Sequence, residues 1–250
     1  DHLTLGSLTK YHCAKIFSYE LRRLLANRFT LGLALITAFY SYWIMNQEII
    51  LGVANTAPWS PWSFGVYMAR VMPLLLTALL FFISFHTSGQ ARAVGTLTSA
   101  AAIPPTRFRL IRMGAILTAF LLLTVIPVGY GWGFYAAVFR CTGFITLAAP
   151  LCFVLLPSAS LVMGAGILCG RHCPALLYVL MALVLAAGII TLPQWLDLFG
   201  AEYLASRPAE LEILDPAFQM TGGQVIGRGV MITAGVGMLM WKTIPKRMVP

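Results

Sequence analysis

The chain has 250 residues, of which 59% are hydrophobic and only 10% are charged. A soluble domain carries about 25% charged residues, so this composition excludes both a water-soluble globular domain and a disordered chain. The five cysteines are too few for a disulfide scaffold. The net charge of +9 is interpreted as a topology signal rather than as nucleic-acid binding, because lysine and arginine collect on the cytoplasmic side of membrane proteins.

Residues 1–28 are predicted to form a cytoplasmic N-terminal segment that contains an amphipathic helix over 11–28. Its apolar residues recur at helical spacing, namely Ile16, Phe17, Leu21, Leu24 and Leu25. Basic and polar residues occupy most of the other positions, which suits a helix lying in the membrane interface. Such a helix serves either as a surface anchor or as a coupling element for a cytoplasmic partner.

The uncharged stretches between charged residues predict six membrane spans within residues 29–250. A span needs about 20 mostly apolar residues. The spans predicted from these stretches are about residues 29–50, 66–87, 112–139, 144–170, 174–193 and 224–241. Four of them include one charged residue at or near an end, namely Glu48, Arg70, Arg112 and Arg228. Residues 194–223 form a polar outer loop. The fold class is therefore an all-α membrane protein with six transmembrane helices. Most of the 17 lysines and arginines fall on the N-terminal side of the membrane, so both chain termini are predicted to be cytoplasmic.

The loop between the second and third spans combines a short helix-prone stretch with prolines and arginines. Gly95 and Thr96 begin this stretch, and Pro104 with Pro105 ends it. Arg107 and the arginines that follow it mark the cytoplasmic end of the third span. The loop is either a docking element or a plain connector.

This arrangement resembles the permease subunits of type-2 ABC (ABC-2) exporters. Those subunits often carry an acidic–Arg–Gly-Thr stretch, followed by a proline and a basic residue, before the third span. The matching positions here are Arg92, Gly95, Thr96, Pro104 and Arg107. Gln90 and Ala91 stand where the family has an acidic residue.

The resemblance implies a non-enzymatic subunit of the bacterial cytoplasmic (inner) membrane that moves an amphipathic cargo outward by alternating access. Its partners would be two cytoplasmic ATPase subunits, which bind ATP and Mg, and a second permease, identical or homologous. The ATPase-coupling surface would comprise Arg22, Arg23, Arg92, Gly95, Thr96, Pro104 and Arg107. No phosphate loop of the form G-x-x-x-x-G-K-[ST] occurs in the chain, so no cofactor is expected in it. The family also has re-entrant helices between spans five and six, where the outer loop 194–223 lies.

A candidate cargo route comprises Arg70, Tyr130, Trp132 and Arg228. Charges within spans are costly and often functional. The two arginines lie near the outer ends of their spans, so they either bind an anionic group or extend to the interface. Pairing of Arg70 with Glu48 is a structural alternative. Small residues four apart, such as Ser160 and Gly164, favour close helix packing.

No catalytic or metal site is expected. The cysteines and histidines on the cytoplasmic side lack a standard zinc spacing, namely His12, Cys13, His86, Cys169, His172 and Cys173. The competing functions are a stand-alone six-helix channel or gradient-driven secondary carrier, and an intramembrane enzyme. The near absence of acidic residues inside the spans argues against an ion-coupled carrier, and no recognisable catalytic motif supports the enzyme.

Overall fold

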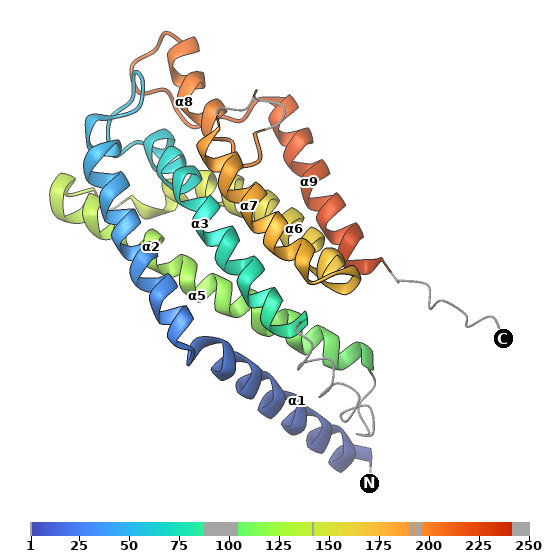
Figure 1. Ribbon diagram of the computed structural model, residues 1–250. Helices are drawn as coiled ribbons and strands as arrows, with labels where there is room; N and C mark the ends of the chain where they lie inside the picture. The colour runs from blue at the N-terminus through green and yellow to red at the C-terminus, as the bar shows by residue number, and fades with distance from the viewer. Residues whose placement is uncertain (1, 88–104, 142, 191–192, 194–196, 242–250) are drawn as a thin grey trace.

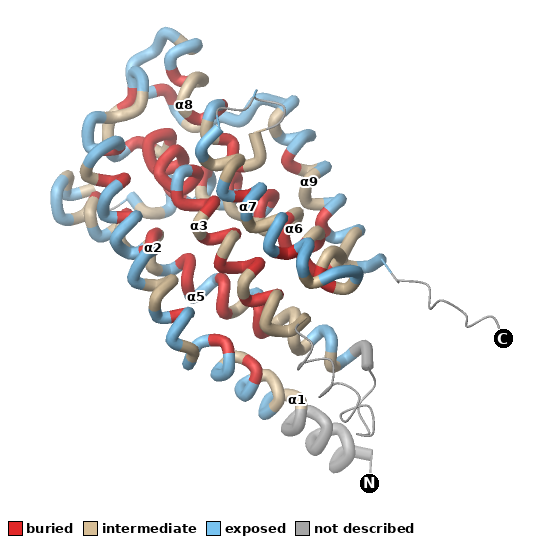
Figure 2. The backbone as a smooth tube through the Cα atoms, viewed as in Figure 1, coloured by how far each residue is buried: buried red, intermediate tan, exposed pale blue. Residues whose placement is uncertain are grey.

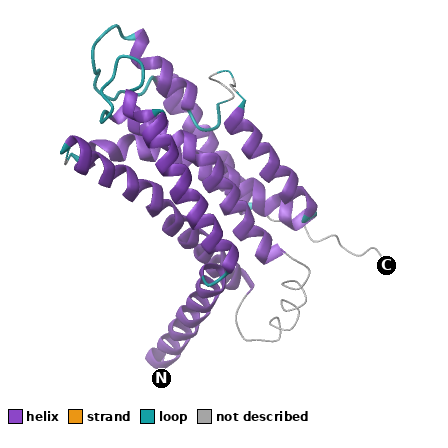
Figure 3. Ribbon diagram, turned by 60° about the vertical axis from the view of Figure 1, so that its left-hand side comes forward, coloured by secondary structure: helices purple, strands orange, loops and turns teal. Residues whose placement is uncertain are grey.

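The computed structural model describes residues 2–87, 105–141, 143–190, 193 and 197–241. All regular elements within these residues are helices, and none of the described residues forms a strand (Figure 3). The α-helices are α1 (His2–Leu25), α2 (Arg28–Gln47), α3 (Pro61–Thr87), α5 (Pro105–Phe139), α6 (Ala148–His172), α7 (Ala175–Ile189), α8 (Ala201–Glu210) and α9 (Gly222–Met240). Two short 3₁₀ helices, η1 (Ile49–Leu51) and η2 (Phe144–Leu147), precede α3 and α6. The all-α fold class is thus confirmed.

Five helical segments of the described chain are long and apolar enough to cross a membrane. They are Arg28–Leu51, Pro61–Thr87, Arg107–Phe139, Phe144–His172 and Gly222–Met240. Each corresponds to one of the predicted spans, with ends that differ by a few residues. The chain therefore has the character of a multi-pass membrane protein.

The predicted span at 174–193 corresponds to a shorter helix. Helix α7 has 15 residues and is about 22 Å long, whereas the hydrocarbon core of a bilayer is about 30 Å thick. A sixth crossing and the cytoplasmic location of both termini therefore stay predictions.

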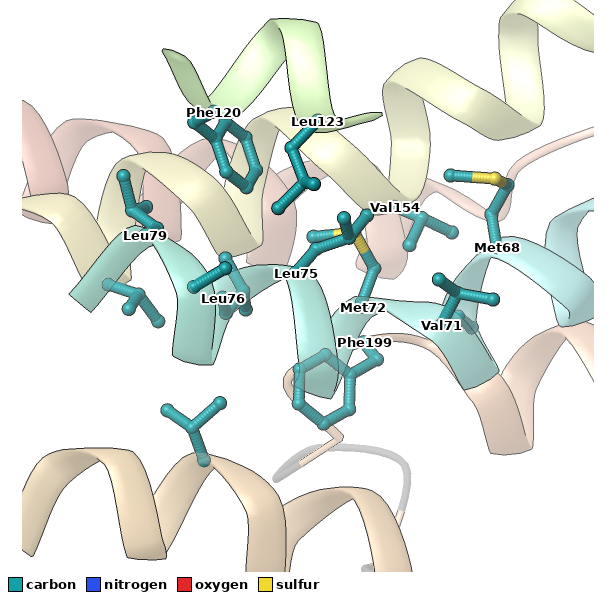
Figure 4. Close-up of a cluster of buried hydrophobic side chains, with 14 of the residues drawn as sticks. Met68, Val71, Met72, Leu75, Leu76, Leu79, Phe120, Leu123, Val154 and Phe199 are labelled. Carbon is teal, nitrogen blue, oxygen red and sulfur yellow. The ribbon is translucent and has the colours of Figure 1, made fainter. Parts of the chain in front are cut away.

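Helix α3 forms the centre of the molecule. It packs against α2, α5, α6, α7 and α8, and it is the most continuously buried helix in Figure 2. Its Met72 and Leu75 lie in one apolar cluster with Phe120 of α5, Val154 of α6 and Phe199, which precedes α8 (Figure 4). The other helices are positioned by their contacts with α3.

The prolines inside the spans do not end the helices, because α3, α5 and α6 continue through Pro73, Pro127 and Pro157. The Thr77 hydroxyl donates to the Pro73 carbonyl at 2.7 Å, and the Tyr67 hydroxyl donates to the Pro127 carbonyl at 2.9 Å. Each bond adds a donor to the proline's own carbonyl, whereas the carbonyl that loses its helical donor is that of the residue four positions before the proline.

Helices α6 and α9 approach each other through glycine. A Cβ atom built on Gly164 would overlap the backbone of Gly235, and one built on Gly235 would overlap the backbone of Ser160. The predicted packing through small residues is confirmed at this crossing, because no larger side chain fits between the two backbones.

Helices α1 and α8 lie at opposite ends of the bundle (Figure 1). Helix α1 begins at His2, earlier than the predicted start at residue 11, and packs against α5. We call the end of the bundle at which α1 lies the basic end; α2 and α5 begin there and α3 ends there. We call the other end, covered by α8, the capped end. The polar outer loop contains α8, whose Tyr203, Leu204 and Pro208 are buried.

Candidate functional site

Three ionisable side chains meet at the basic end, between α1, α3 and α5. The Oε2 atom of Glu20 lies 3.2 Å from Nε2 of His86, and its Oε1 atom lies 3.4 Å from Nε of Arg112. Glu20 is only 5% exposed. A buried carboxylate needs such partners, because an unpaired charge is costly to remove from water. We call these three residues the Glu20 cluster.

The partners of Glu20 are held by their own helices. His86 Nδ1 lies 3.2 Å from the carbonyl oxygen of Phe82, one turn earlier in α3. A protonated imidazole donates to both of its oxygen neighbours at once, whereas a neutral ring donates to only one. The Arg112 guanidinium lies over the ring of Phe108, 4.7 Å from its centroid. These contacts fix the geometry of the cluster.

The cluster also controls the charge of Glu20. The hydrogen bond with His86 has the largest effect and lowers the pKa of the Glu20 carboxyl below its ordinary value of 4.5. Burial raises this pKa, but electrostatic interactions with His86 and Arg112 lower it further, and the net shift is downward. Glu20 is therefore ionised at neutral pH.

The Glu20 cluster joins α1 to both helices that flank residues 88–104. His86 is the residue before the end of α3, and Arg112 lies near the start of α5. A single side chain of α1 thus contacts the helix that leads into this segment and the helix that leads out of it.

The predicted coupling residues fall into two groups. Arg22 and Arg23 of α1 and Arg107 of α5 are exposed at the basic end. The other four, Arg92, Gly95, Thr96 and Pro104, lie outside the described residues.

At the capped end, Arg228 of α9 is buried rather than extended to the membrane surface. It is 6% exposed, and its guanidinium donates to the carbonyl oxygens of Leu198 at 2.7 Å and Asp197 at 3.3 Å. The same group lies 4.7 Å from the ring centroid of Phe153. Gly200, with φ of +77°, lets the backbone approach so closely that a Cβ there would overlap the guanidinium.

The Asp197 carboxylate does not pair with Arg228. It accepts hydrogen bonds from the backbone N–H groups of Phe199, Gly200 and Glu202 at 3.1, 2.9 and 2.8 Å. These bonds satisfy donors at the start of α8 that would otherwise have no partner. Trp62 of α3 then holds the chain after α8, since its indole N–H donates to the Pro216 carbonyl at 2.8 Å. We call α8 with these contacts the α8 cap.

The other predicted cargo residues have contacts of their own. Arg70 Nε is 3.5 Å from Glu48 Oε2, and both side chains are about half exposed, so the predicted Arg70–Glu48 pair is confirmed. The hydroxyl of Tyr130 accepts a hydrogen bond from Asn46 of α2 at 3.2 Å. Trp132 lies against Phe144, with ring centroids 5.2 Å apart. The contacts of the four residues do not converge on one cavity.

Sequence reasoning missed Glu20 and the interior of the α8 cap. The signal for Glu20 was present, because it lies on the apolar stripe of α1 with Phe17, Leu21 and Leu24. An acidic residue on such a stripe needs a buried partner. Within the described residues, no group of three or more His, Cys, Asp or Glu side chains is arranged to hold a metal ion, and His86 bonds Glu20 instead.

Comparisons with protein-family models, with curated proteins and with solved structures gave no match. The helical fold and its long apolar helices indicate the class, an all-helical, multi-pass membrane protein.

Proposed function

We propose that the chain is the permease subunit of an ATP-driven ABC-2 exporter in the bacterial inner membrane. It moves an amphipathic cargo outward by alternating access, together with a second permease subunit and two ATPase subunits that hydrolyse ATP. The observation that carries this proposal is the Glu20 cluster. It attaches the amphipathic helix α1 to α3 and α5, the two helices that flank the candidate coupling segment 88–104.

This attachment supports a mechanical role for the basic end. A displacement of α1 by a cytoplasmic partner passes to α3, because separating Glu20 from His86 and Arg112 would leave buried charges unpaired. Arg22, Arg23 and Arg107 are exposed beside this attachment and suit acidic side chains on an ATPase. Helix α3 also contacts α8, so its movement reaches the capped end.

The α8 cap supports an outward gate in the same scheme. Arg228 holds the start of the cap through hydrogen bonds to two carbonyl oxygens. A buried guanidinium without acceptors is costly, so a movement of α3 relative to α9 would open the capped end if water replaced these carbonyl oxygens.

Purification from native membranes in a mild detergent, followed by mass spectrometry, tests the proposal. We expect a stoichiometric partner that carries a G-x-x-x-x-G-K-[ST] phosphate loop. A well-behaved oligomer of this chain without such a partner, active in transport by itself, would instead support the channel or the gradient-driven carrier.

Charge reversal at Arg107 is a sharper test of the coupling surface. In Arg107→Glu we expect transport to fall about ten-fold or more while ATP hydrolysis continues, because like charges across an interface cost several kcal/mol. Arg140→Glu is the matched control, since Arg140 is exposed at the other end of α5. Both activities are assayed with the assembled complex in liposomes. Normal coupled transport in Arg107→Glu would remove this residue from the coupling surface.

A further inference from the structure

An apolar groove of about 280 Å³ lies between α2, α3 and α7, in the half of the bundle that adjoins the basic end. Helix α3 lies between the other two helices (Figure 1). Thr77 and Phe81 of α3 line the groove between the α2 residues on one side and Met181 of α7 on the other. The Phe29 and Phe81 rings, with centroids 5.7 Å apart, also line it.

The groove follows one face of α2. Phe29, Gly32, Leu33 and Ile36 line it and have the i, i+3, i+4, i+7 spacing of a single helix face. From Arg28 to Ile36 the helix rises about 12 Å, close to the roughly 15 Å depth of one leaflet of the hydrocarbon core. An extended acyl chain lying along α2 therefore matches the groove in direction and in depth.

The end of the groove is positively charged. Arg28 lines it, is exposed, and has no ion-pair partner among the described residues. It is also the first residue of α2, where the partial positive charge of the helix N-terminus adds to that of the guanidinium. A guanidinium binds phosphate through two parallel hydrogen bonds. Every phospholipid carries a phosphate, so the positive charge at this end favours a lipid of net negative charge over a zwitterionic one, whose own cation offsets its phosphate.

Gly32 keeps the middle of the groove open. Glycine inside a helix is unfavourable by about 1 kcal/mol relative to alanine, and a Cβ at Gly32 would meet no atom of this chain within 4 Å. Close packing within the described bundle therefore does not require glycine at this position, and the absence of a side chain leaves room in the groove.

We propose that this groove binds one acyl chain of an anionic phospholipid from the leaflet at the basic end, with the lipid phosphate on Arg28. The occupant is a membrane lipid rather than a second copy of the chain, because a bare guanidinium stands at the mouth of an otherwise apolar groove. This site depends on insertion into a membrane and not on the transport function proposed above.

Native mass spectrometry of the full chain tests the proposal. The protein is released from micelles that contain equal amounts of phosphatidylglycerol and phosphatidylcholine with identical acyl chains, and the lipids retained per chain are counted. We expect the wild-type protein to retain phosphatidylglycerol preferentially. Gly32→Leu fills the groove and lowers this retention about ten-fold. Gly237→Leu is its matched control, because a Cβ at Gly237 of α9 also meets no atom within 4 Å.

The charge at the mouth is tested separately. Arg28→Gln lowers the preference for phosphatidylglycerol about five-fold, the effect of one arginine near an anionic surface, whereas Arg28→Lys retains part of it. Arg23→Gln removes the same charge from an exposed residue of α1 that does not line the groove, and it keeps the preference. The Arg28 series also provides the test if Gly32→Leu does not fold.

Three results would overturn the proposal. The first is equal lipid retention in Gly32→Leu and Gly237→Leu, and the second is an unchanged preference in Arg28→Gln. The third is a dimer that Gly32→Leu abolishes and Gly237→Leu keeps, with no phospholipid retained by either. This third result would assign the groove to another copy of the chain.

Discussion

Glu20 illustrates how one residue can set the position of a whole helix. Its neighbours on the apolar face of α1 are hydrophobic. If α1 lay on the membrane without contacts to other helices, this carboxylate would weaken its binding to the membrane. In the folded chain it instead accepts hydrogen bonds from two side chains that lie 66 and 92 positions away. The residue therefore determines which face of α1 turns toward α3 and α5.

Replacing Glu20 by glutamine should make this contribution measurable. The pKa of Glu20 is lower in the folded than in the unfolded chain, so its contribution is full above the unfolded value of about 4.5 and is lost as the pH falls through the folded value. At neutral pH we expect Glu20→Gln to lower the free energy of unfolding by about 1–3 kcal/mol. Thermal unfolding in detergent at several pH values measures the difference from wild type, which should shrink below about pH 4.5.

Glu210→Gln is the control for this experiment. Glu210 pairs with Arg207 on the surface at 2.7 Å, with half of its side chain exposed, and surface pairs contribute little to stability. We expect almost no change at any pH. A difference between Glu20→Gln and wild type that does not vary with pH would contradict the role of the carboxylate charge.

The elements themselves were largely predictable, because a bilayer imposes a strict requirement on helix length and charge. Arg28, Arg171 and Trp241 fall within two residues of predicted span ends and of helix ends alike. Two elements were not predictable in this way. Helix α7 has no charged residue to mark its outer end. The segment that contains α8 was predicted to be a polar loop because of its charged residues, although Tyr203 and Leu204 give α8 an apolar side.

The contacts of the candidate site could not be predicted. Local periodicity places Glu20 on the apolar stripe of α1, and the span ends place His86 and Arg112 at one side of the membrane. Which side chains meet depends on helix rotation and crossing, and the sequence periodicity of one helix carries no information about these. The burial of Arg228 is a similar case, since its partners are backbone carbonyl groups that have no sequence signature.

The crossing of α6 and α9 gives a test at the scale of these elements. Gly235→Ala places a methyl group against the backbone of Ser160, and we expect a loss of about 1–3 kcal/mol in the free energy of unfolding because the helices must separate. Gly237→Ala, two residues along the same helix, adds its methyl group to open space and should be neutral or slightly stabilising. Chemical or thermal unfolding of both variants measures the change in the free energy of unfolding. Equal effects of the two substitutions would mean that the close crossing does not contribute to stability.

At the scale of the whole molecule, α3 connects two differently built ends. Its last turn supplies His86 to the Glu20 cluster, and its first turn supplies Trp62 to the α8 cap. The basic end is held by charged side chains, whereas the cap is held by an arginine on carbonyl groups and by aromatic contacts such as Trp62 with Phe218. Ends held by different interactions respond differently to a displacement of α3, and the cap is the end with fewer buried charges to separate.

Replacing Arg228 by methionine tests whether the cap opens independently of the bundle. Methionine keeps an unbranched apolar stem but is shorter than arginine and leaves the carbonyl groups of Asp197 and Leu198 without their donor, which costs about 1–3 kcal/mol. If this cost is confined to the cap, amide hydrogen exchange in α8 should accelerate about ten-fold or more, while exchange in α3 stays unchanged. Hydrogen exchange with mass spectrometry in lipid nanodiscs measures both regions.

Arg207→Met provides the matched control, because Arg207 lies on α8 itself but donates to Glu210 on its surface. It removes a guanidinium from the same cap without touching the carbonyl groups that hold it, so exchange in α8 should remain close to that of the wild type. Equal acceleration of α3 and α8 in Arg228→Met would show that the cap and the bundle open as one unit. In that case the capped end does not act as the separate gate that we propose above, and the cap moves only with a rearrangement of the whole bundle around α3.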